Sequence, residues 1–211
     1  MNNLKKIAQK KYLEFSRYEG SQHIATEHAI YRILENIKLN NSKNILEIGL
    51  GIGTIYSSVY VLNDKIHYTG TENNDFCLNS LRNNLKNSYH SLNIYDNIFS
   101  IKDRDFDLII IDGKDESIET LSVLAKDNCV LIIEGDRKDQ EEKIKKMYPK
   151  SIFVHIISLE KNNIKGVFES SNYQGGVKVF FVRPNLKQLL YCYKHKVLTF
   201  IKYKIRKIKK I

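Results

Sequence analysis

Apolar positions along the chain follow two alternating periods. A spacing of three or four residues predicts helices over 2–18, 23–38, 54–61, 74–87, 116–126 and 139–147. Short apolar and β-branched runs predict strands within 44–48, 65–72, 90–95, 105–113, 129–134, 151–159 and 177–182. Because strands and helices alternate, the pattern predicts an α/β fold with a largely parallel sheet. The last two runs, joined by a long loop, predict a closing antiparallel hairpin.

The chain is organised around residues 44–54, where a strand runs into three glycines at every second position. Gly49, Gly51 and Gly53 leave a turn without side chains, so a ligand can approach the backbone closely. Thr54 then begins a helix whose first amide groups point back at the same place. The stretch therefore predicts a ligand site at the end of the first strand.

Two kinds of cofactor-binding turn compete for this stretch. A dinucleotide fingerprint, Gly-x-Gly-x-x-Gly, would need a third glycine where Thr54 stands, so that match fails. The spacing Glu47-x-Gly49-x-Gly51-x-Gly53 instead resembles the first motif of the class I S-adenosylmethionine-dependent methyltransferases. The resemblance implies S-adenosylmethionine as the cofactor, with Glu47 near its methionine end and the three glycines and Thr54 around it.

A second signal follows 19 residues after Gly53, where the next strand ends on Glu72. A carboxylate offers two acceptors and a ribose diol two donors, so Glu72, with its neighbour Asn73, is a candidate ribose ligand. Nicotinamide-binding domains also have an acidic residue at this place, so Glu72 does not distinguish them from methyltransferases. After the third strand, the methyltransferase resemblance implies that Asp96 meets the adenine amino group. A turn formed by Asp96 and Asn97 is the alternative.

Residues 19–23 separate the first two predicted helices with turn-forming residues. Their Gly-x-Gln pattern, which includes Ser21 and Gln22, resembles a loop of the catechol-type O-methyltransferases. The resemblance implies that this loop closes over the cofactor. An ordinary connection between two helices is the alternative interpretation.

An apolar strand flanked by acids lies within 105–113. Such a strand is expected at the centre of a parallel sheet covered on both faces, and open α/β sheets bind ligands at the carboxyl ends of their strands. Asp112 stands at this end and is a candidate for both cofactor binding and catalysis. The segment resembles the fourth-strand motif of small-molecule O-methyltransferases.

Two departures from the catechol-type enzymes concern the metal and the base. Those enzymes complete a magnesium site with an Asn after the fifth strand, which this chain lacks. The motif therefore does not support a metal at Asp112, Glu134 and Asp136, and none is predicted. They also place a lysine three residues after the metal-binding Asp, whereas Lys114 follows Asp112 by two. The candidates for removing the acceptor's proton are Asp112, Asp136, Lys114 and His23.

At 211 residues, with 42% hydrophobic and 27% charged residues, the chain has the size and composition of one soluble domain. It shows no signal peptide and no apolar run long enough to span a membrane. Its three scattered cysteines indicate a reducing compartment, so we expect a cytoplasmic protein. Residues 185–211 hold nine basic and no acidic residues, so much of the net charge of +10 lies there. The near-neutral body does not favour a nucleic-acid partner.

The basic segment 185–211 also repeats apolar residues at helical spacing, with lysines filling the other face. We treat it as an amphipathic tail beyond a methyltransferase domain of residues 1–184. A helix of this kind can attach to an anionic membrane surface, which for a cytoplasmic protein is the inner face. Packing on its own domain, formation of a homodimer and a frayed end are the alternatives.

Together these features predict a Rossmann-like α/β fold with a seven-stranded methyltransferase sheet of order 3-2-1-4-5-7-6, its last strand antiparallel and helices on both faces. The resemblance spans 21–184. It implies methyl transfer from S-adenosylmethionine to an oxygen of a small molecule or glycan, with surface polysaccharide biosynthesis as the preferred context. The alternatives are a non-catalytic S-adenosylmethionine-binding or scaffold protein, an aminopropyltransferase on the same fold and, third, a nicotinamide oxidoreductase.

Overall fold

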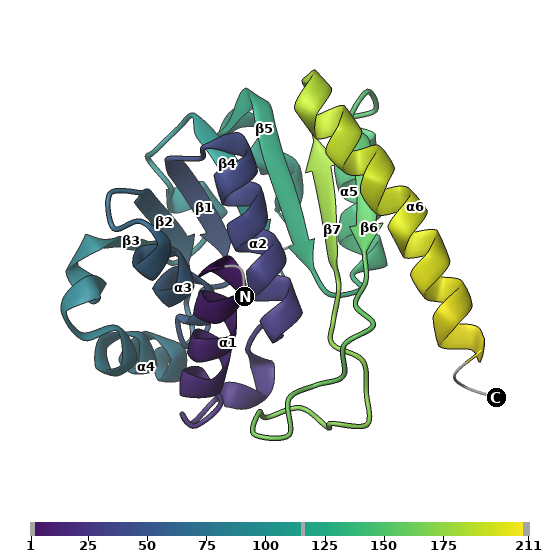
Figure 1. The fold of residues 1–211 in the computed structure, drawn as a ribbon. Coiled ribbons are helices and arrows are strands. Elements are labelled where there is room, and N and C mark those ends of the chain that lie inside the picture. The colour runs from purple at the N-terminus through teal and green to yellow at the C-terminus, as the bar shows by residue number, and fades with distance from the viewer. Residues whose placement is uncertain (1–2, 115–116, 209–211) are drawn as a thin grey trace.

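The computed structural model describes residues 3–114 and 117–208 and shows a central sheet with helices on both faces (Figure 1). The strand order is β3-β2-β1-β4-β5-β7-β6, and β7 runs antiparallel to both of its neighbours. This arrangement confirms the predicted methyltransferase sheet. The strands are β1 (Asn44–Ile48), β2 (His67–Thr71), β3 (Leu92–Tyr95), β4 (Phe106–Ile111), β5 (Ala125–Glu134), β6 (Ile152–Ile156) and β7 (Val177–Phe181).

The helices divide between the two faces and one edge of the sheet. One face packs against α1, α2, α3 and α4, and the other against α5 and short 3-10 helices. The long α6 lies against β6 at the edge (Figure 1). The helices are α1 (Asn3–Phe15), α2 (Glu27–Asn40), α3 (Thr54–Leu62), α4 (Asp75–Leu85), α5 (Lys138–Met147) and α6 (Leu186–Ile208).

The central strand β4 shows why the sheet is buried on both faces. Its side chains alternate between two hydrophobic cores, because successive residues of a strand point to opposite sides. Leu108 and Ile110 join the core under α1 to α3, while Ile109 and Ile111 join the core under α5. All four are fully buried. A strand covered on both faces must be largely apolar, and Asp107, near the start of β4, is its single charged residue.

The helix predicted over 116–126, part of which lies outside the described residues, is wrong where the structure describes it. Only a short 3-10 helix, Ile118–Val123, forms there, and β5 already begins at Ala125. The cause is tertiary pairing. Phe106 donates its amide proton to the carbonyl of Leu124, 3.0 Å away, and pairs with Ala125 in the sheet. This pairing begins the strand early and leaves too few residues for a full helix.

Two backbones meet without side chains where β1 and β4 end. The carbonyl of Ile48 accepts hydrogen bonds from the amides of Asp112 and Gly113, at 3.0 and 2.7 Å. Gly49 has a φ of +86°, and a Cβ placed on it would lie 2.7 Å from the backbone N and Cα of Gly113. A glycine is required at position 49 both by its conformation and by this contact.

This contact predicts the stability of two glycine variants. Gly49→Ala combines a left-handed residue with a backbone clash, and we expect it to lower the free energy of unfolding by about 3 kcal/mol or more. Gly135→Ala has a similar φ, +75°, but open space around the new Cβ, so about 1 kcal/mol is expected. Urea unfolding of both variants measures the difference. Equal losses would show that the contact between the two backbones does not matter.

Candidate functional site

A cavity of about 600 Å³, open to solvent, lies at the carboxyl ends of β1 and β4. It is lined by the loop before α2, the glycine turn after β1, the start of α4 and the end of β4. This is the end of the sheet at which the sequence predicts a ligand. The residues that matter most to its chemistry are Gln22, His23, Glu47, Thr54, Phe76 and Asp112.

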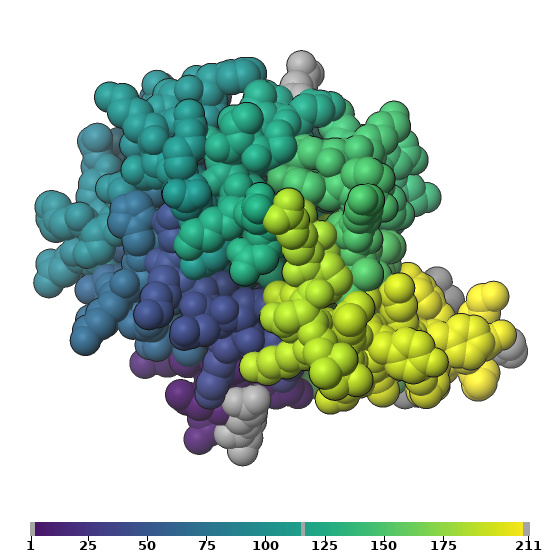
Figure 2. Space-filling view, turned by 90° about the horizontal axis from the view of Figure 1, so that it is seen from above, coloured from purple at the N-terminus to yellow at the C-terminus, as the bar shows by residue number. Residues whose placement is uncertain are grey.

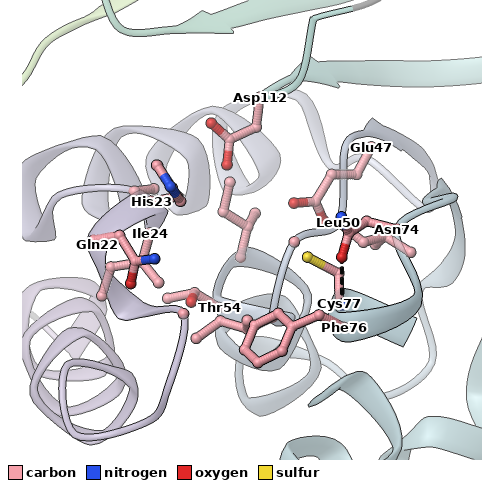
Figure 3. A pocket seen from close by; sticks show the side chains of 15 residues that line it. Gln22, His23, Ile24, Glu47, Leu50, Thr54, Asn74, Phe76, Cys77 and Asp112 are labelled. Atoms are coloured by element: carbon pink, nitrogen blue, oxygen red, sulfur yellow. Dashed lines mark hydrogen bonds between the residues drawn. The ribbon is translucent and has the colours of Figure 1, made fainter. Parts of the chain in front are cut away.

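The cavity has a polar end and an apolar end. Figure 3 shows the carboxylates of Glu47 and Asp112 pointing into it from two neighbouring strands, with His23 facing them from the loop before α2. Phe76 lies on the other side of the cavity. Ile52 of the glycine turn also lines the cavity, and a Cβ on Gly20 would meet both Phe76 and Ile52. A ligand that fits must therefore bring positive or polar groups to one end and a flat or apolar group to the other.

Glu47 is the most deeply buried acid of the cavity, with no exposed surface. Its Oε2 accepts a 2.5 Å hydrogen bond from the Tyr68 hydroxyl, whereas its Oε1 is buried without a hydrogen-bond partner in the described chain. Burial raises the pKa of Glu47 to about 8, although the Tyr68 hydrogen bond opposes the shift. The side chain therefore stands ready to ionise beside a bound cation.

Asp112 belongs to a second group of buried charges. Burial and the neighbouring charges of Glu134 and Glu47 raise its pKa well above the usual range, and Arg137 opposes this effect. The Arg137 Nη2 atom lies 3.5 Å from Asp112 Oδ1 and also donates to the Asp112 carbonyl. Burial raises the pKa of Glu134 as well. Asp112 and Glu134 therefore favour sharing a proton as long as no positively charged ligand adds to the charge of Arg137.

Glu72 ends β2 beside the cavity and is fixed by backbone amides. Its Oε2 accepts from the amide of Gly51 at 2.8 Å, and its Oε1 accepts from the amides of Asn73 and Asn74 at 3.0 Å each. Oε2 keeps a further lone pair for a ligand, whereas Oε1 already accepts two hydrogen bonds. The predicted ribose ligand is thus held in one orientation next to Gly51 and Asn74, which both line the cavity. Asn73 itself is exposed and does not line it.

The glycines of the turn have different roles. A Cβ on Gly51 would meet no atom within 4 Å, so this position borders open space. A Cβ on Gly53 would lie 2.9 Å from Leu81, so Gly53 lets α3 approach α4. Thr54 begins α3 and lines the cavity, and its buried hydroxyl has no hydrogen-bond partner in the described chain. Gly51 and Thr54 thus face the ligand space, while Gly49 and Gly53 shape the backbone.

The loop before α2 forms one wall of the cavity, and its closure over a cofactor stays a prediction. Gly20 has a φ of +84°, and a Cβ there would lie 2.6 Å from Phe76 and 2.9 Å from Ile52. This packing brings Gln22 to the cavity wall. Ser21 is half-buried beside it but does not line the cavity.

Three further candidates lie outside the cavity. Asp96 is exposed after β3, and Lys114 is exposed after β4. Asp136 forms an ion pair with Lys178, with Oδ1 and Nζ 2.9 Å apart, and hydrogen bonding to this lysine lowers the pKa of Asp136. The roles assigned to these residues stay predictions. Among the described residues, no three His, Cys, Asp or Glu side chains are arranged to hold a metal ion.

Sequence reasoning missed the two residues that hold the buried acids, Tyr68 and Arg137. The register of the sheet carries a signal for the first. Ile45 pairs with Tyr68, so Glu47, two residues further along β1, points to the same side of the sheet as the tyrosine. No comparable signal identifies Arg137, because its contact depends on the path of the chain after β5.

Comparison with known proteins gives a match over part of the chain. The family model of the methyltransferase small domain matches residues 27–112, which include β1, β2, β3 and β4 and end at Asp112. No curated protein shows significant similarity to the sequence.

Solved structures share the fold at low sequence identity. An O-methyltransferase from Bacillus cereus in complex with SAH is 13% identical, with a TM-score of 0.59, and the match covers 83% of this chain and 90% of that one. The O-methyltransferase TomG from Streptomyces achromogenes, in complex with SAM, is 12% identical, with a TM-score of 0.60, and the match covers 85% of this chain and 90% of that one. A precorrin-6y C5,15-methyltransferase from Geobacter metallireducens is 16% identical, with a TM-score of 0.56, and the match covers 76% of this chain and 90% of that one. The same fold therefore occurs in methyltransferases with different acceptors.

The buried Glu47 predicts a pH dependence of stability. With a pKa of about 8 when folded and an ordinary value of 4.5, Glu47 binds more protons in the folded state between these values. Its contribution to the free energy of unfolding is therefore present at low pH and is lost as the pH rises to about 8. Glu47→Gln removes this titration and keeps an oxygen that can accept from Tyr68.

We expect urea unfolding to show the Glu47→Gln variant gaining stability relative to the wild type as the pH rises from about 5 to about 8. Glu19→Gln, at an exposed loop position, is the matched control and should show no such trend. A difference between Glu47→Gln and the wild type that is independent of pH would contradict the burial of this carboxyl group.

Proposed function

We propose that this chain, which has the class I methyltransferase fold and matches the methyltransferase small domain over residues 27–112, transfers a methyl group from S-adenosylmethionine to an oxygen of a small molecule or glycan. One observation carries the proposal. The cavity at the carboxyl ends of β1 and β4 has Glu47 and Asp112 at one end and Phe76 at the other. This pattern suits a cofactor that is cationic at one end and aromatic at the other.

The acidic end of the cavity supports binding of the methionine half. The unpartnered Oε1 of Glu47 and the carboxyl of Asp112 are acceptors for a positively charged group. A cation there favours the ionised forms of both acids, which burial otherwise disfavours. The ligand and the two acids therefore stabilise each other's charge.

The opposite end supports binding of the adenosine half. Glu72 offers its Oε2, which accepts only one backbone hydrogen bond, to a ribose hydroxyl, and this contact is charge-assisted. Gly51 leaves the backbone open beside it. Phe76 and Ile52 provide an apolar wall for the adenine ring, with Asp96 as the predicted partner of its amino group. Gln22 covers the site from the loop before α2.

When bound, S-adenosylmethionine supplies a methyl group made electrophilic by its sulfonium. The chain must hold the acceptor oxygen in line with this group and take up the acceptor's proton. Asp112 is the base we favour, because its carboxyl group lines the cavity and a bound cation favours its ionised, proton-accepting form. Arg137 keeps its carboxylate oriented. The ion pair with Lys178 makes Asp136 a weaker base.

Support for oxygen as the acceptor atom comes from the O-methyltransferases among the structures of this fold. Support for a glycan linked to a membrane comes from the basic α6, whose lysines would draw the protein to anionic lipid. A small aromatic alcohol is the simplest acceptor to test beside it.

Cofactor binding is tested by calorimetric titration with S-adenosylmethionine and with NAD. We expect binding of S-adenosylmethionine alone. Glu72→Ala should weaken it by about 10- to 100-fold, because a charge-assisted hydrogen bond to the ribose is lost. Asp64→Ala removes an exposed acid before β2 rather than after it and should leave the affinity unchanged. Binding of NAD instead, or of neither ligand, would refute the proposed cofactor.

Methyl transfer is tested with methyl-labelled S-adenosylmethionine and a panel of phenols and membrane-linked glycans. We expect label in one acceptor class. Asp112→Asn should lower kcat by about 100-fold or more, because the proton acceptor is lost while the shape of the side chain is kept. A comparable loss in Asp136→Asn alone would transfer the role to that residue. Tight cofactor binding without transfer to any acceptor would favour a non-catalytic binding protein.

A further inference from the structure

The C-terminal helix α6 buries its polar side. The residues that face the body are Gln188, Cys192, His195 and Thr199, at a spacing of three or four. Gln188 Nε2 donates to the side chain of Asn40 at 2.7 Å. The helix is therefore attached to its own domain, as one of the alternatives from the sequence held, but largely through polar side chains.

The contact of α6 with the edge strand β6 and the residues just after it includes side-chain donors on main-chain carbonyls. The Thr199 hydroxyl donates to the carbonyl of His155 at 2.8 Å, and Lys202 Nζ donates to the carbonyl of Ile157 at 2.7 Å. Arg206 Nε donates to the carbonyl of Ser158 at 3.0 Å. These contacts fix which side of the helix faces inward.

The opposite side of α6 is apolar and exposed. With 3.6 residues per turn, the positions 186, 190, 193, 197, 200 and 208 fall on one face. They hold Leu186, Leu190, Tyr193, Val197, Phe200 and Ile208, and the same face also carries Lys204, whose Nζ lies 5.4 Å from the centre of the Phe200 ring. Tyr193 is 74% exposed and Phe200 62%. Figure 2 shows α6 as an uncovered ridge on the surface. This polarity is the reverse of that of an ordinary surface helix, which buries its apolar face.

Basic residues border this apolar stripe. Helical geometry places Lys187 and Lys194 along one side and Lys196 and Lys207 along the other. Residues 186–208 contain seven Lys or Arg and no Asp or Glu. A long lysine can lay its methylene groups on apolar surface and extend its ammonium group to a nearby anion.

We propose that the outward face of α6 lies in the interface of an anionic lipid membrane. The apolar stripe enters the boundary between headgroups and acyl chains, and the bordering lysines reach the lipid phosphates. No helix among the described residues is long and apolar enough to cross a membrane, so this contact is peripheral.

The charge of α6 selects the membrane over a second copy of the chain. Two copies joined through this face would bring together two helices with seven positive charges each and no negative charge to pair them. Such like charges oppose association. An anionic bilayer instead attracts every lysine near its surface and offers an apolar layer of unlimited area beneath it.

Vesicle binding by the full chain tests the proposal. Because the inner face of α6 is part of the fold, substitutions on the outer face are preferable to truncation. The test variant combines Leu190→Ser, Val197→Ser and Phe200→Ser. The matched control combines Phe99→Ser, Val123→Ser and Ile164→Ser, which remove similar exposed side chains elsewhere. Circular dichroism confirms that both variants fold.

Sedimentation is measured with vesicles of phosphatidylcholine and phosphatidylglycerol in equal parts, and with phosphatidylcholine alone. We expect the wild type and the control to bind the anionic vesicles, and the test variant to bind at least about 100-fold more weakly. A variant with Lys194→Gln and Lys196→Gln should bind about 30-fold more weakly. Pure phosphatidylcholine should bind the wild type poorly.

Three outcomes would overturn the proposal. The wild type fails to bind anionic vesicles, or the test variant binds them as well as the wild type does. The third outcome is a dimer in analytical ultracentrifugation that the test variant, but not the control, converts to a monomer, which would assign the face to a second copy.

Discussion

At the carboxyl ends of β1 and β4, two backbones approach so closely that neither carries a side chain at the contact. The carbonyl of Ile48, at the end of β1, accepts hydrogen bonds from two successive amides just after β4, and Gly49 lies against Gly113. Since Asp112 immediately precedes this contact and Glu47 immediately precedes Ile48, the crossing places both acids beside one another. The position of the cavity, its acidic end and the direction of the glycine turn all depend on it.

Two buried carboxyl groups this close disfavour each other's ionised form, and the surrounding residues offset this effect only in part. Tyr68 stabilises one oxygen of Glu47, and Arg137 contacts Asp112. Both acids nevertheless keep a raised pKa, because burial outweighs these contacts. Strained electrostatics of this kind are typical of sites where a ligand supplies the missing charge, whereas a purely structural cluster would be expected to pair its charges internally.

The sequence was sufficient for the sheet and for one wall of the cavity. Apolar periodicity predicts β4, and the spacing of Gly49, Gly51 and Gly53 predicts the ligand turn. Contacts between residues far apart in the sequence could not be predicted from these patterns. Asp136 forms an ion pair with Lys178 of β7, a residue 42 positions later in the sequence. The periodicity of α6 correctly predicts a two-sided helix, but a pattern cannot say which side faces inward, and here it is the polar one.

The polar inner side of α6 also explains how the sheet ends. β6 pairs only with β7 among the described strands, so its outer main-chain groups would be open to another strand. Thr199 donates to a carbonyl of β6, and Lys202 and Arg206 donate to carbonyls just after its end. A helix that caps an exposed strand edge needs hydrogen-bond donors on its inner side, which leaves its apolar residues no place but the outside. Protection of the sheet edge against aggregation thereby leaves exposed the apolar surface for which we propose a lipid partner.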